Sequence, residues 1–312
     1  MTHYRDRYDD IYNSLSRAEL QRGSRGFDDL VAGPDLFEAD TSLWLGFYTE
    51  EGLDLALEKY GFYRDLARQG FDDVRIETNT SDPNKHLLRL WSADDEIGDP
   101  LVELVVRRDY LHPHSELADR VTTSRIAVLT VDWLLLQNPT AQFDAARPPL
   151  PGQRFPGLGV GAQVLELLRN ACRRLGLAGL ANVPSFFHNA FFYSQEFRHF
   201  DPRWQGIFLA LCRNLLPGSR MSIAAASWAV HWELVRRHAD DRPTPWFHEL
   251  MLYALDDKLR AYFDDSPYRR EVQKALKNHR FEVDESELSQ QLRERGIEPF
   301  DPTKIELWIG DQ

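Results

Sequence analysis

The sequence predicts an α+β protein, in which a run of strands in the first half of the chain is flanked by helical segments. Two patterns predict this class. Between residues 73 and 137 apolar and polar residues alternate at strand spacing, with turn clusters between the runs. Before and after this region the apolar residues recur at helical spacing instead.

The N-terminal segment, residues 1–69, is predicted to be helical, with an amphipathic helix at residues 53–68 that Gly70 closes. Four strands follow in series, and the short turns between them favour an antiparallel meander. They cover residues 73–78, 86–91, 101–107 and 125–137. A proline-rich loop at residues 138–156 then leads to a helix at residues 160–175.

A short apolar strand at residues 177–183 and a helix at residues 186–197 complete a predicted core that spans residues 70–200. The C-terminal region, residues 201–312, is predicted to be mostly helical. It is expected to pack on the core, because no flexible linker joins the two. Its helices are predicted at residues 204–216, 222–237, 246–263 and 268–278, and alternation at residues 304–309 predicts an additional edge strand.

The composition excludes several classes of protein. Hydrophobic residues make up 43% and aromatic residues 12% of the 312 residues, more than a mainly disordered chain contains. No stretch approaches the ~18 apolar residues of a transmembrane helix, and no apolar run follows the charged N-terminus. Cys172 and Cys212, the two cysteines, fall in apolar helical patterns. We therefore expect a cytoplasmic protein with buried thiols.

The charge balance bears on the partners of the protein. The chain has 37 lysine and arginine residues against 49 aspartate and glutamate residues, which gives a net charge of −12. Such a charge repels nucleic-acid phosphates and anionic lipids over long range. We therefore expect no nucleic-acid and no membrane partner, while the sequence favours no particular oligomeric state.

The segment from Gln153 to Ala162 is the one that indicates chemistry, because alternate glycines open the helix at residues 160–175. Glycine permits a positive φ and a close approach to the backbone, and a helix N-terminus offers unpaired N–H groups that suit a phosphate. The alternative is a glycine-rich turn that only starts the helix. A P-loop is excluded because Ala162 and Gln163 follow Gly161, where that motif requires lysine.

The order of strand meander, glycine loop, helix, strand and helix resembles that of the GNAT acyltransferase superfamily over about residues 50–200. The last helix carries Ala190 and Tyr193, with Phe197 after it. The resemblance implies a mixed sheet flanked by helices, and acetyl-CoA or another acyl-CoA as co-substrate. The backbone amides of the loop would hold the pyrophosphate. The residues that correspond are Arg154, Gly157, Leu158, Gly159, Val160, Gly161 and Ala162.

The family pattern, Arg/Gln-x-x-Gly-x-Gly/Ala, fits this sequence in two registers. One uses Arg154 with Gly157 and Gly159, and it begins the helix two residues early. The other uses Gly159 and Gly161, which suits the start of the helix but places Pro156 where arginine or glutamine belongs.

The resemblance also implies a proton donor to the departing CoA thiolate, and Tyr193 corresponds by its position in the helix. The alternative is that Tyr193 packs among the many phenylalanines around it. A general base is also needed, because an amine must lose a proton to react. The candidates are Asp132, which lies within an apolar strand where burial would raise its pKa, together with His188 and Glu103.

His112 and His114 are of metal-ligand type, but a proline separates them and no cysteine is near, so we expect no metal. The predicted function is transfer of an acetyl or other acyl group from acyl-CoA to an amine, on a small molecule or a protein. The alternative is a noncatalytic module of the same shape that binds a ligand or a protein. A third interpretation is an unrelated fold in which the glycine loop is only a turn.

Overall fold

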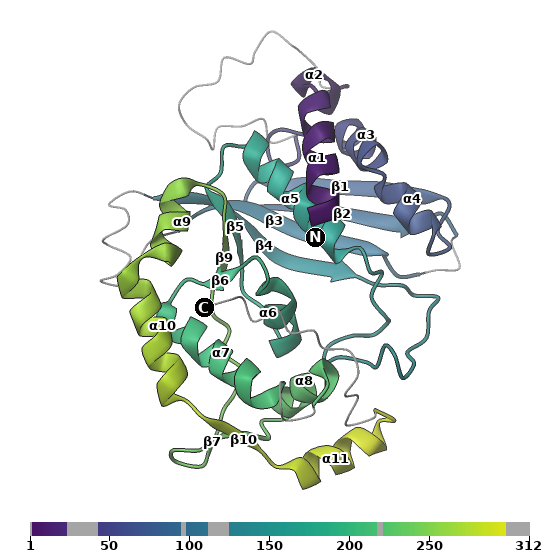
Figure 1. Cartoon of the computed structure of the whole chain (residues 1–312). Coiled ribbons are helices and arrows are strands. Elements are labelled where there is room, and N and C mark those ends of the chain that lie inside the picture. Colours follow the sequence, from purple (N-terminus) through teal and green to yellow (C-terminus); the bar gives the residue numbers. More distant parts are fainter. Residues whose placement is uncertain (1, 24–42, 95–97, 112–124, 217–220, 298–312) are drawn as a thin grey trace. The chain divides into compact units, whose positions relative to one another are not determined.

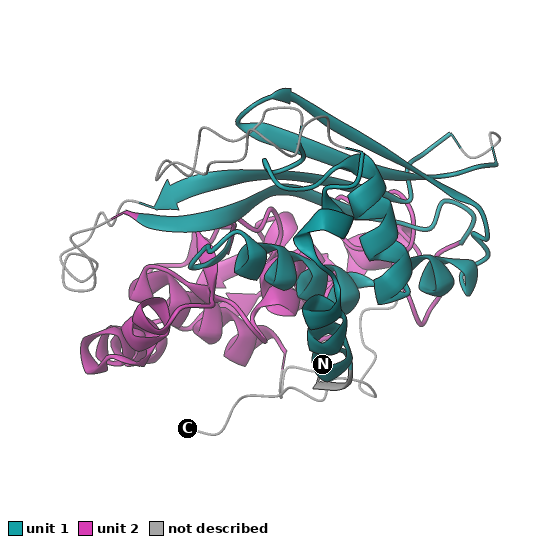
Figure 2. Cartoon of the chain, turned by 90° about the horizontal axis from the view of Figure 1, so that it is seen from above, with its two compact units in different colours: residues 1–111, 126–141, 157–180 teal, residues 112–125, 142–156, 181–312 magenta. Residues whose placement is uncertain are grey.

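The computed structural model describes residues 2–23, 43–94, 98–111, 125–216 and 221–297. These residues form two compact units (Figure 2). Unit 1 comprises residues 1–111, 126–141 and 157–180, and unit 2 comprises residues 112–125, 142–156 and 181–312. The division of the chain at residues 69 and 200 stays a prediction. The expected edge strand at residues 304–309 and the pair His112 and His114 lie outside the described residues.

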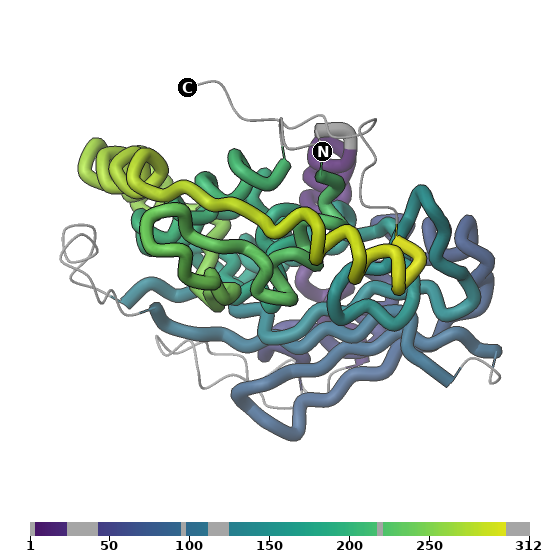
Figure 3. The backbone as a smooth tube through the Cα atoms, turned by 90° about the horizontal axis from the view of Figure 1, so that it is seen from below, coloured from purple at the N-terminus to yellow at the C-terminus, as the bar shows by residue number. Residues whose placement is uncertain are grey.

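Unit 1 contains the predicted meander. The strands pair in chain order, each antiparallel to the next, and lie side by side in Figures 1 and 3. They are β1 (Val74–Asp82), β2 (Lys85–Ser92), β3 (Val102–Leu111) and β4 (Ile126–Leu136). Leu88 on β2 and Leu104 on β3 are paired in register and buried, so one face of this sheet carries the core of the unit.

The helices of unit 1 are α1 (Thr2–Ser14), α2 (Arg17–Leu20), α3 (Glu50–Tyr60), α4 (Phe62–Ala67) and α5 (Gly161–Arg174). The single helix predicted at residues 53–68 is therefore wrong, because it breaks at Gly61 into α3 and α4. Gly61 adopts a left-handed backbone with φ +77° and ends α3. The Glu50 carboxylate accepts hydrogen bonds from the backbone and hydroxyl of Thr78, which fastens α3 to β1.

The strand β5 (Gly179–Asn182) follows α5 and lies next to β4 in the sheet. The chain reaches it by a helical crossover, the connection that parallel strands require, whereas β1 to β4 need only turns. Ala178 donates a backbone hydrogen bond to Ala127, so β5 begins beside the start of β4. The α+β class, with a mixed sheet flanked by helices, is confirmed.

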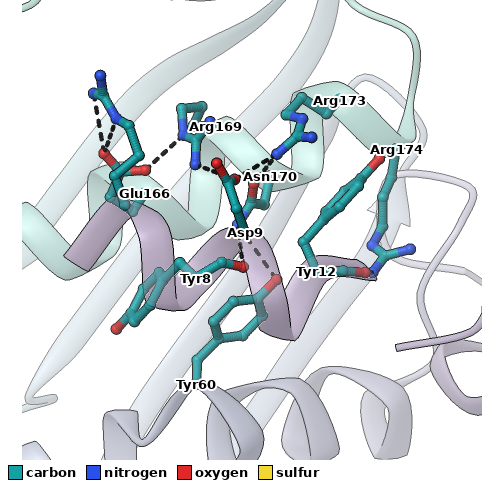
Figure 4. A network of polar contacts seen from close by, with 10 residues as sticks. Tyr8, Asp9, Tyr12, Tyr60, Glu166, Arg169, Asn170, Arg173 and Arg174 are labelled. Atoms are coloured by element: carbon teal, nitrogen blue, oxygen red, sulfur yellow. Dashed lines mark hydrogen bonds and ion pairs between the residues drawn. The ribbon is translucent and has the colours of Figure 1, made fainter. Parts of the chain in front are cut away.

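A buried ion-pair network holds α1 against α5 (Figure 4). Glu166 on α5 is only 3% exposed, and its carboxylate accepts from Arg169 Nε at 2.5 Å and from Arg5 Nε at 3.2 Å. Asp9 on α1 accepts from Arg169 and Arg173, each at 2.6 Å. Burial raises the pKa of Asp9, but the hydrogen bonds and charges of the two arginines outweigh it, and the net pKa is lowered.

Unit 2 begins with α6 (Phe187–Tyr193), which is shorter than the helix predicted at residues 186–197. Its other helices are α7 (Pro202–Leu215), α8 (Ile223–His231), α9 (Asp257–Asp264), α10 (Ser266–Asn278) and α11 (Glu285–Glu294). Gly206 sets the contact of α7 with α10, because a Cβ at that position would lie 2.4 Å from Val272 O. Of the described helices, none has the length and apolar character to span a membrane.

Unit 2 also contains strands that the helical prediction missed. They are β6 (Arg198–His199), β7 (Val235–Arg237), β8 (Arg242–Pro243), β9 (Met251–Ala254) and β10 (Phe281–Val283). The helix predicted at residues 222–237 ends at His231, because Glu233 adopts φ +57°, and β7 follows it. The helix predicted at residues 246–263 is wrong in its first half, which forms β9 and pairs with β6.

We expect Arg169→Leu to lower the free energy of unfolding by about 3 kcal/mol, because it removes the main partner of the buried Glu166 carboxylate. Arg260→Leu is the matched control, since Arg260 forms only an exposed ion pair with Asp257 at 3.0 Å and should cost below about 1 kcal/mol. Urea unfolding followed by circular dichroism measures both. Equal losses for the two variants would show that the buried network does not hold α1 in place.

Candidate functional site

The glycine loop at residues 157–161 lies beside the end of β4, within unit 1. Gly157 forms an isolated antiparallel bridge with Gln137, the residue that follows β4. Burial alternates along the loop: Leu158 and Val160 are 1% and 3% exposed, whereas the three glycines are exposed. The two apolar side chains therefore anchor the loop in the core, and the glycines turn bare backbone toward solvent.

Gly159 is the position of the loop that requires glycine. Its φ of +73° lies in the left-handed region, which residues with a Cβ adopt only at a cost. A Cβ built on Gly159 meets no described atom within 4 Å, so the space next to it is open. An approaching group can therefore reach the backbone here at close range.

The helix α5 begins at Gly161 with no side-chain cap. Val160 stands at the N-cap position and offers no side-chain acceptor, and the first turn contains no acidic residue. The N–H groups at the start of a helix lack partners within the helix, and the helix dipole adds a partial positive charge there. This end of α5 is therefore suited to an anion.

The helix α5 begins at Gly161, which is the start that the second register of the glycine motif, with Gly159 and Gly161, expects. The match of either register to the family pattern stays a prediction. Arg154 is exposed and belongs to unit 2, where its guanidinium lies 4.9 Å from the centre of the Phe155 ring. A role for Arg154 in binding stays a prediction.

The strand β4 extends well beyond its neighbour β5. β4 has eleven residues and β5 has four, so at least seven residues of β4 have no partner in β5. Trp133, in this second half of β4, is 49% exposed. Within unit 1 the second half of β4 therefore presents backbone N–H and C=O groups on the side away from β3.

Asp132 is exposed. The prediction that its apolar strand buries it is therefore wrong. Val105 pairs with Trp133 and Val106 pairs with Val131, so Asp132 is the extra residue of a β-bulge. The bulge turns its carboxylate to solvent, where both oxygens lie 3.1 Å from Arg107 Nε. Its role as a base stays a prediction, as does that of Glu103, whose carboxylate pairs with Arg89 at 2.6 Å.

His188 and Tyr193 both lie on α6 in unit 2. His188 is 3% exposed and stacks on Phe186 at 5.4 Å, and burial is the main cause that lowers its pKa to about 4. Such a side chain is neutral at pH 7 and a weak base. Tyr193 is the last residue of α6, and burial raises the pKa of its hydroxyl, which therefore keeps its proton at neutral pH. Its ring lies 5.5 Å from that of Phe197.

Of the side chains that sequence reasoning proposed, the structure places the five loop residues Gly157 to Gly161 together and beside β4. Asp132 lies on β4 in the same unit, five residues before Gln137, whereas His188 and Tyr193 belong to unit 2. The sequence did not predict the β-bulge at Asp132 or the second half of β4 that has no partner in β5. Neither feature changes the local alternation of apolar and polar residues. No group of three or more side chains suited to a metal occurs among the described residues.

Comparisons with known proteins give weak likenesses. No protein-family model matches the chain, and no curated protein matches it. Two solved structures of the AtaT toxin are each 16% identical to it. The first is a mutant bound to the C-terminus of the antitoxin AtaR and acetyl-CoA. The match covers 41% of this chain and 87% of that AtaT chain, with a TM-score of 0.26. The second is complexed with acetyl-methionyl-tRNAfMet, and the match covers 52% of this chain and 77% of that AtaT chain, with a TM-score of 0.24.

Proposed function

We propose that the protein transfers an acetyl or other acyl group from acyl-CoA to an amine. The observation that carries this proposal is the exposed glycine backbone at the uncapped start of α5, beside the end of a strand whose second half has no partner in β5. An anion site next to a free strand edge suits a ligand that has a pyrophosphate at one end and an amide-containing arm. Acyl-CoA has this chemistry.

The pyrophosphate would bind at the loop. The backbone N–H groups of residues 159–162 would donate to its oxygens, and the absence of side chains at Gly159 and Gly161 would let them approach closely. Leu158 and Val160, both buried, keep the loop in this conformation before the ligand arrives. A preorganised site of this kind loses little conformational entropy on binding.

The pantetheine arm would run along the free half of β4, where its amide groups could pair with the strand backbone. Asp132 precedes Gln137 by five residues, and a strand rises about 3.4 Å per residue, so the bulge lies roughly 17 Å from the loop. An extended pantetheine arm can cover this span. The thioester would therefore come to lie near the bulge, where a backbone N–H outside the ladder can stabilise the developing oxyanion.

The reaction would be direct transfer. The amine nitrogen attacks the thioester carbon, the carbon–sulfur bond breaks, and the thiolate takes up a proton. The donor that the resemblance implies is the Tyr193 hydroxyl. The amine gives up its own proton to a base. The Tyr193 hydroxyl carries a proton at neutral pH, as a donor must, although burial raises its pKa and so makes it a weaker acid than a free tyrosine.

The acceptor would be a small-molecule or protein amine, as the net charge of −12 favours neutral or cationic ligands. The exclusion of nucleic acid stays a prediction, and one of the AtaT structures is a complex with an acylated tRNA. An aminoacyl-tRNA therefore belongs beside polyamines and peptides in any test of acceptors.

A second candidate function is binding of acyl-CoA without turnover. The state of the proposed bases favours it: Asp132 and Glu103 are paired with arginines, and the pKa of His188 is about 4. Pro156, which the second register places at the family's arginine or glutamine, removes one N–H donor from the loop.

Gly159→Val should abolish binding of CoA and acetyl-CoA as measured by calorimetry, because the branched side chain blocks the phosphate and disfavours φ +73°. Gly98→Val is the matched control, since a Cβ there also meets open space but Gly98 has no positive φ. The control should bind like the wild type. If the wild type gives no heat with any CoA species at millimolar concentration, both candidate functions are wrong.

Tyr193→Phe should lower turnover by roughly 10²–10⁴, since it removes a general acid but keeps the ring. The melting temperature should change little, because one ordinary hydrogen bond contributes only about 1 kcal/mol. Tyr63→Phe serves as control, as it removes an exposed hydroxyl bonded to Asp54. Turnover of Tyr193→Phe within about twofold of the wild type would make Tyr193 a packing residue. Binding without turnover for every acceptor would favour the noncatalytic function.

A further inference from the structure

Unit 1 contains an apolar cavity of about 90 Å³, separate from the glycine loop. Its lining comes from β2, β3, α3 and α5 and from Trp44 and Tyr48 of the turn that precedes α3. The lining is almost entirely hydrocarbon, with Leu90 and Val102 of the sheet facing Leu57 and Leu168 of the helices. We refer to it as the unit 1 cavity.

Trp44, one of the lining residues, carries a polar group that has no partner among the described residues. Trp44 is 4% exposed, and its indole Nε1 is buried without an acceptor among the described residues. Other polar side chains of the lining are paired: Asn170 donates to the Tyr60 hydroxyl at 3.3 Å, and Arg174 donates to the Tyr12 carbonyl at 2.6 Å. A buried N–H without an acceptor is destabilising, and an occupant of the cavity that carries an acceptor would relieve this cost at Trp44. Other buried side-chain atoms of the described residues, such as the Tyr8 hydroxyl, also lack a partner, but Trp44 combines this lack with a place in the lining of the cavity.

The turn that carries Trp44 is held in place from two strands. Trp44 and Tyr48 exchange backbone hydrogen bonds of 2.8 and 3.0 Å, and Leu45 between them adopts a left-handed φ of +53°. His86 Nδ1 accepts from the Leu45 N–H at 2.7 Å, and Arg108 donates to the Leu45 carbonyl. A strained residue persists only where its surroundings enforce it, and such strain gathers at ligand sites.

Water fits this cavity poorly, because an ordered buried water needs two to four polar partners and the lining is apolar. An apolar cavity of about 150 Å³ takes up benzene, so one of about 90 Å³ suits a small ring or a short chain. The indole adds a requirement, since the occupant must bring an oxygen or nitrogen that accepts its hydrogen bond.

We propose that the unit 1 cavity binds a small apolar carbonyl compound, or the apolar carbonyl-bearing end of a larger molecule, through a hydrogen bond from Trp44 Nε1. The apolar lining supplies most of the affinity by removing hydrocarbon from water. The Trp44 indole supplies the selectivity, because only an occupant with an acceptor satisfies it. This inference does not depend on acyl transfer.

Two probes of the same shape test the proposal: cyclopentanone, and methylenecyclopentane, in which a CH₂ group replaces the oxygen. The full chain is titrated with each, and the indole N–H signals are followed by ¹⁵N nuclear magnetic resonance. Cyclopentanone should shift the Trp44 Nε1–H signal saturably and bind roughly three- to tenfold more tightly than the hydrocarbon, the range expected for one hydrogen bond. Trp44→Phe identifies that signal by its loss.

Two variants sharpen the test. Trp44→Phe keeps an aromatic ring but removes the donor, so the two probes should bind it within about twofold of each other. Ala171→Leu fills the cavity from α5 and should abolish binding of both probes. The proposal is overturned if cyclopentanone gives no saturable shift, or if the wild type binds both probes equally. It is also overturned if Ala171→Leu still binds. The two wild-type titrations decide the matter even if a variant does not fold.

Discussion

The arrangement of unit 1 depends on one buried carboxylate. Glu166 lies on the side of α5 that faces the protein interior, and an unpaired charge there would be prohibitively costly. Arg169 on the same helix and Arg5 on α1 compensate it, and Asp9 balances the excess positive charge (Figure 4). A shift of α1 along α5 would separate Arg5 from Glu166, and Asp9 from Arg169 and Arg173, so these pairs favour one register of α1 on α5.

The fixed position of α5 bears on both sites proposed in unit 1. Its first residue, Gly161, follows a loop that Leu158 and Val160 anchor in the core, so the uncapped end of the helix stays beside the end of β4. Its buried side forms a wall of the unit 1 cavity. One helix thus presents a polar terminus to solvent and an apolar flank to the interior, and the two sites follow from these different surfaces.

Local patterns predicted those parts of the fold that depend on local structure. Alternation over β1 to β4 predicted the meander, and the alternate glycines predicted the loop and the start of α5. The break at Gly61 was missed because a helical stripe continues across it. β6, β9 and β10 were missed because their pairing partners are distant, as with Phe281 opposite Arg237. β7 and β8 pair locally but have only three and two residues, too few for a pattern. The exposure of Asp132 depends on a bulge that only the pairing with β3 creates, so its apolar neighbours suggested burial.

The proposed function requires that the backbone at the start of α5 binds the pyrophosphate of CoA. The most direct measurement is a ¹⁵N nuclear magnetic resonance titration of the full chain with CoA and, in parallel, with pantetheine, which lacks the pyrophosphate. CoA should shift the amide signals of Gly159, Gly161 and Ala162 most strongly, and pantetheine should leave them nearly unchanged. Saturable CoA binding that leaves these three signals in place would contradict it.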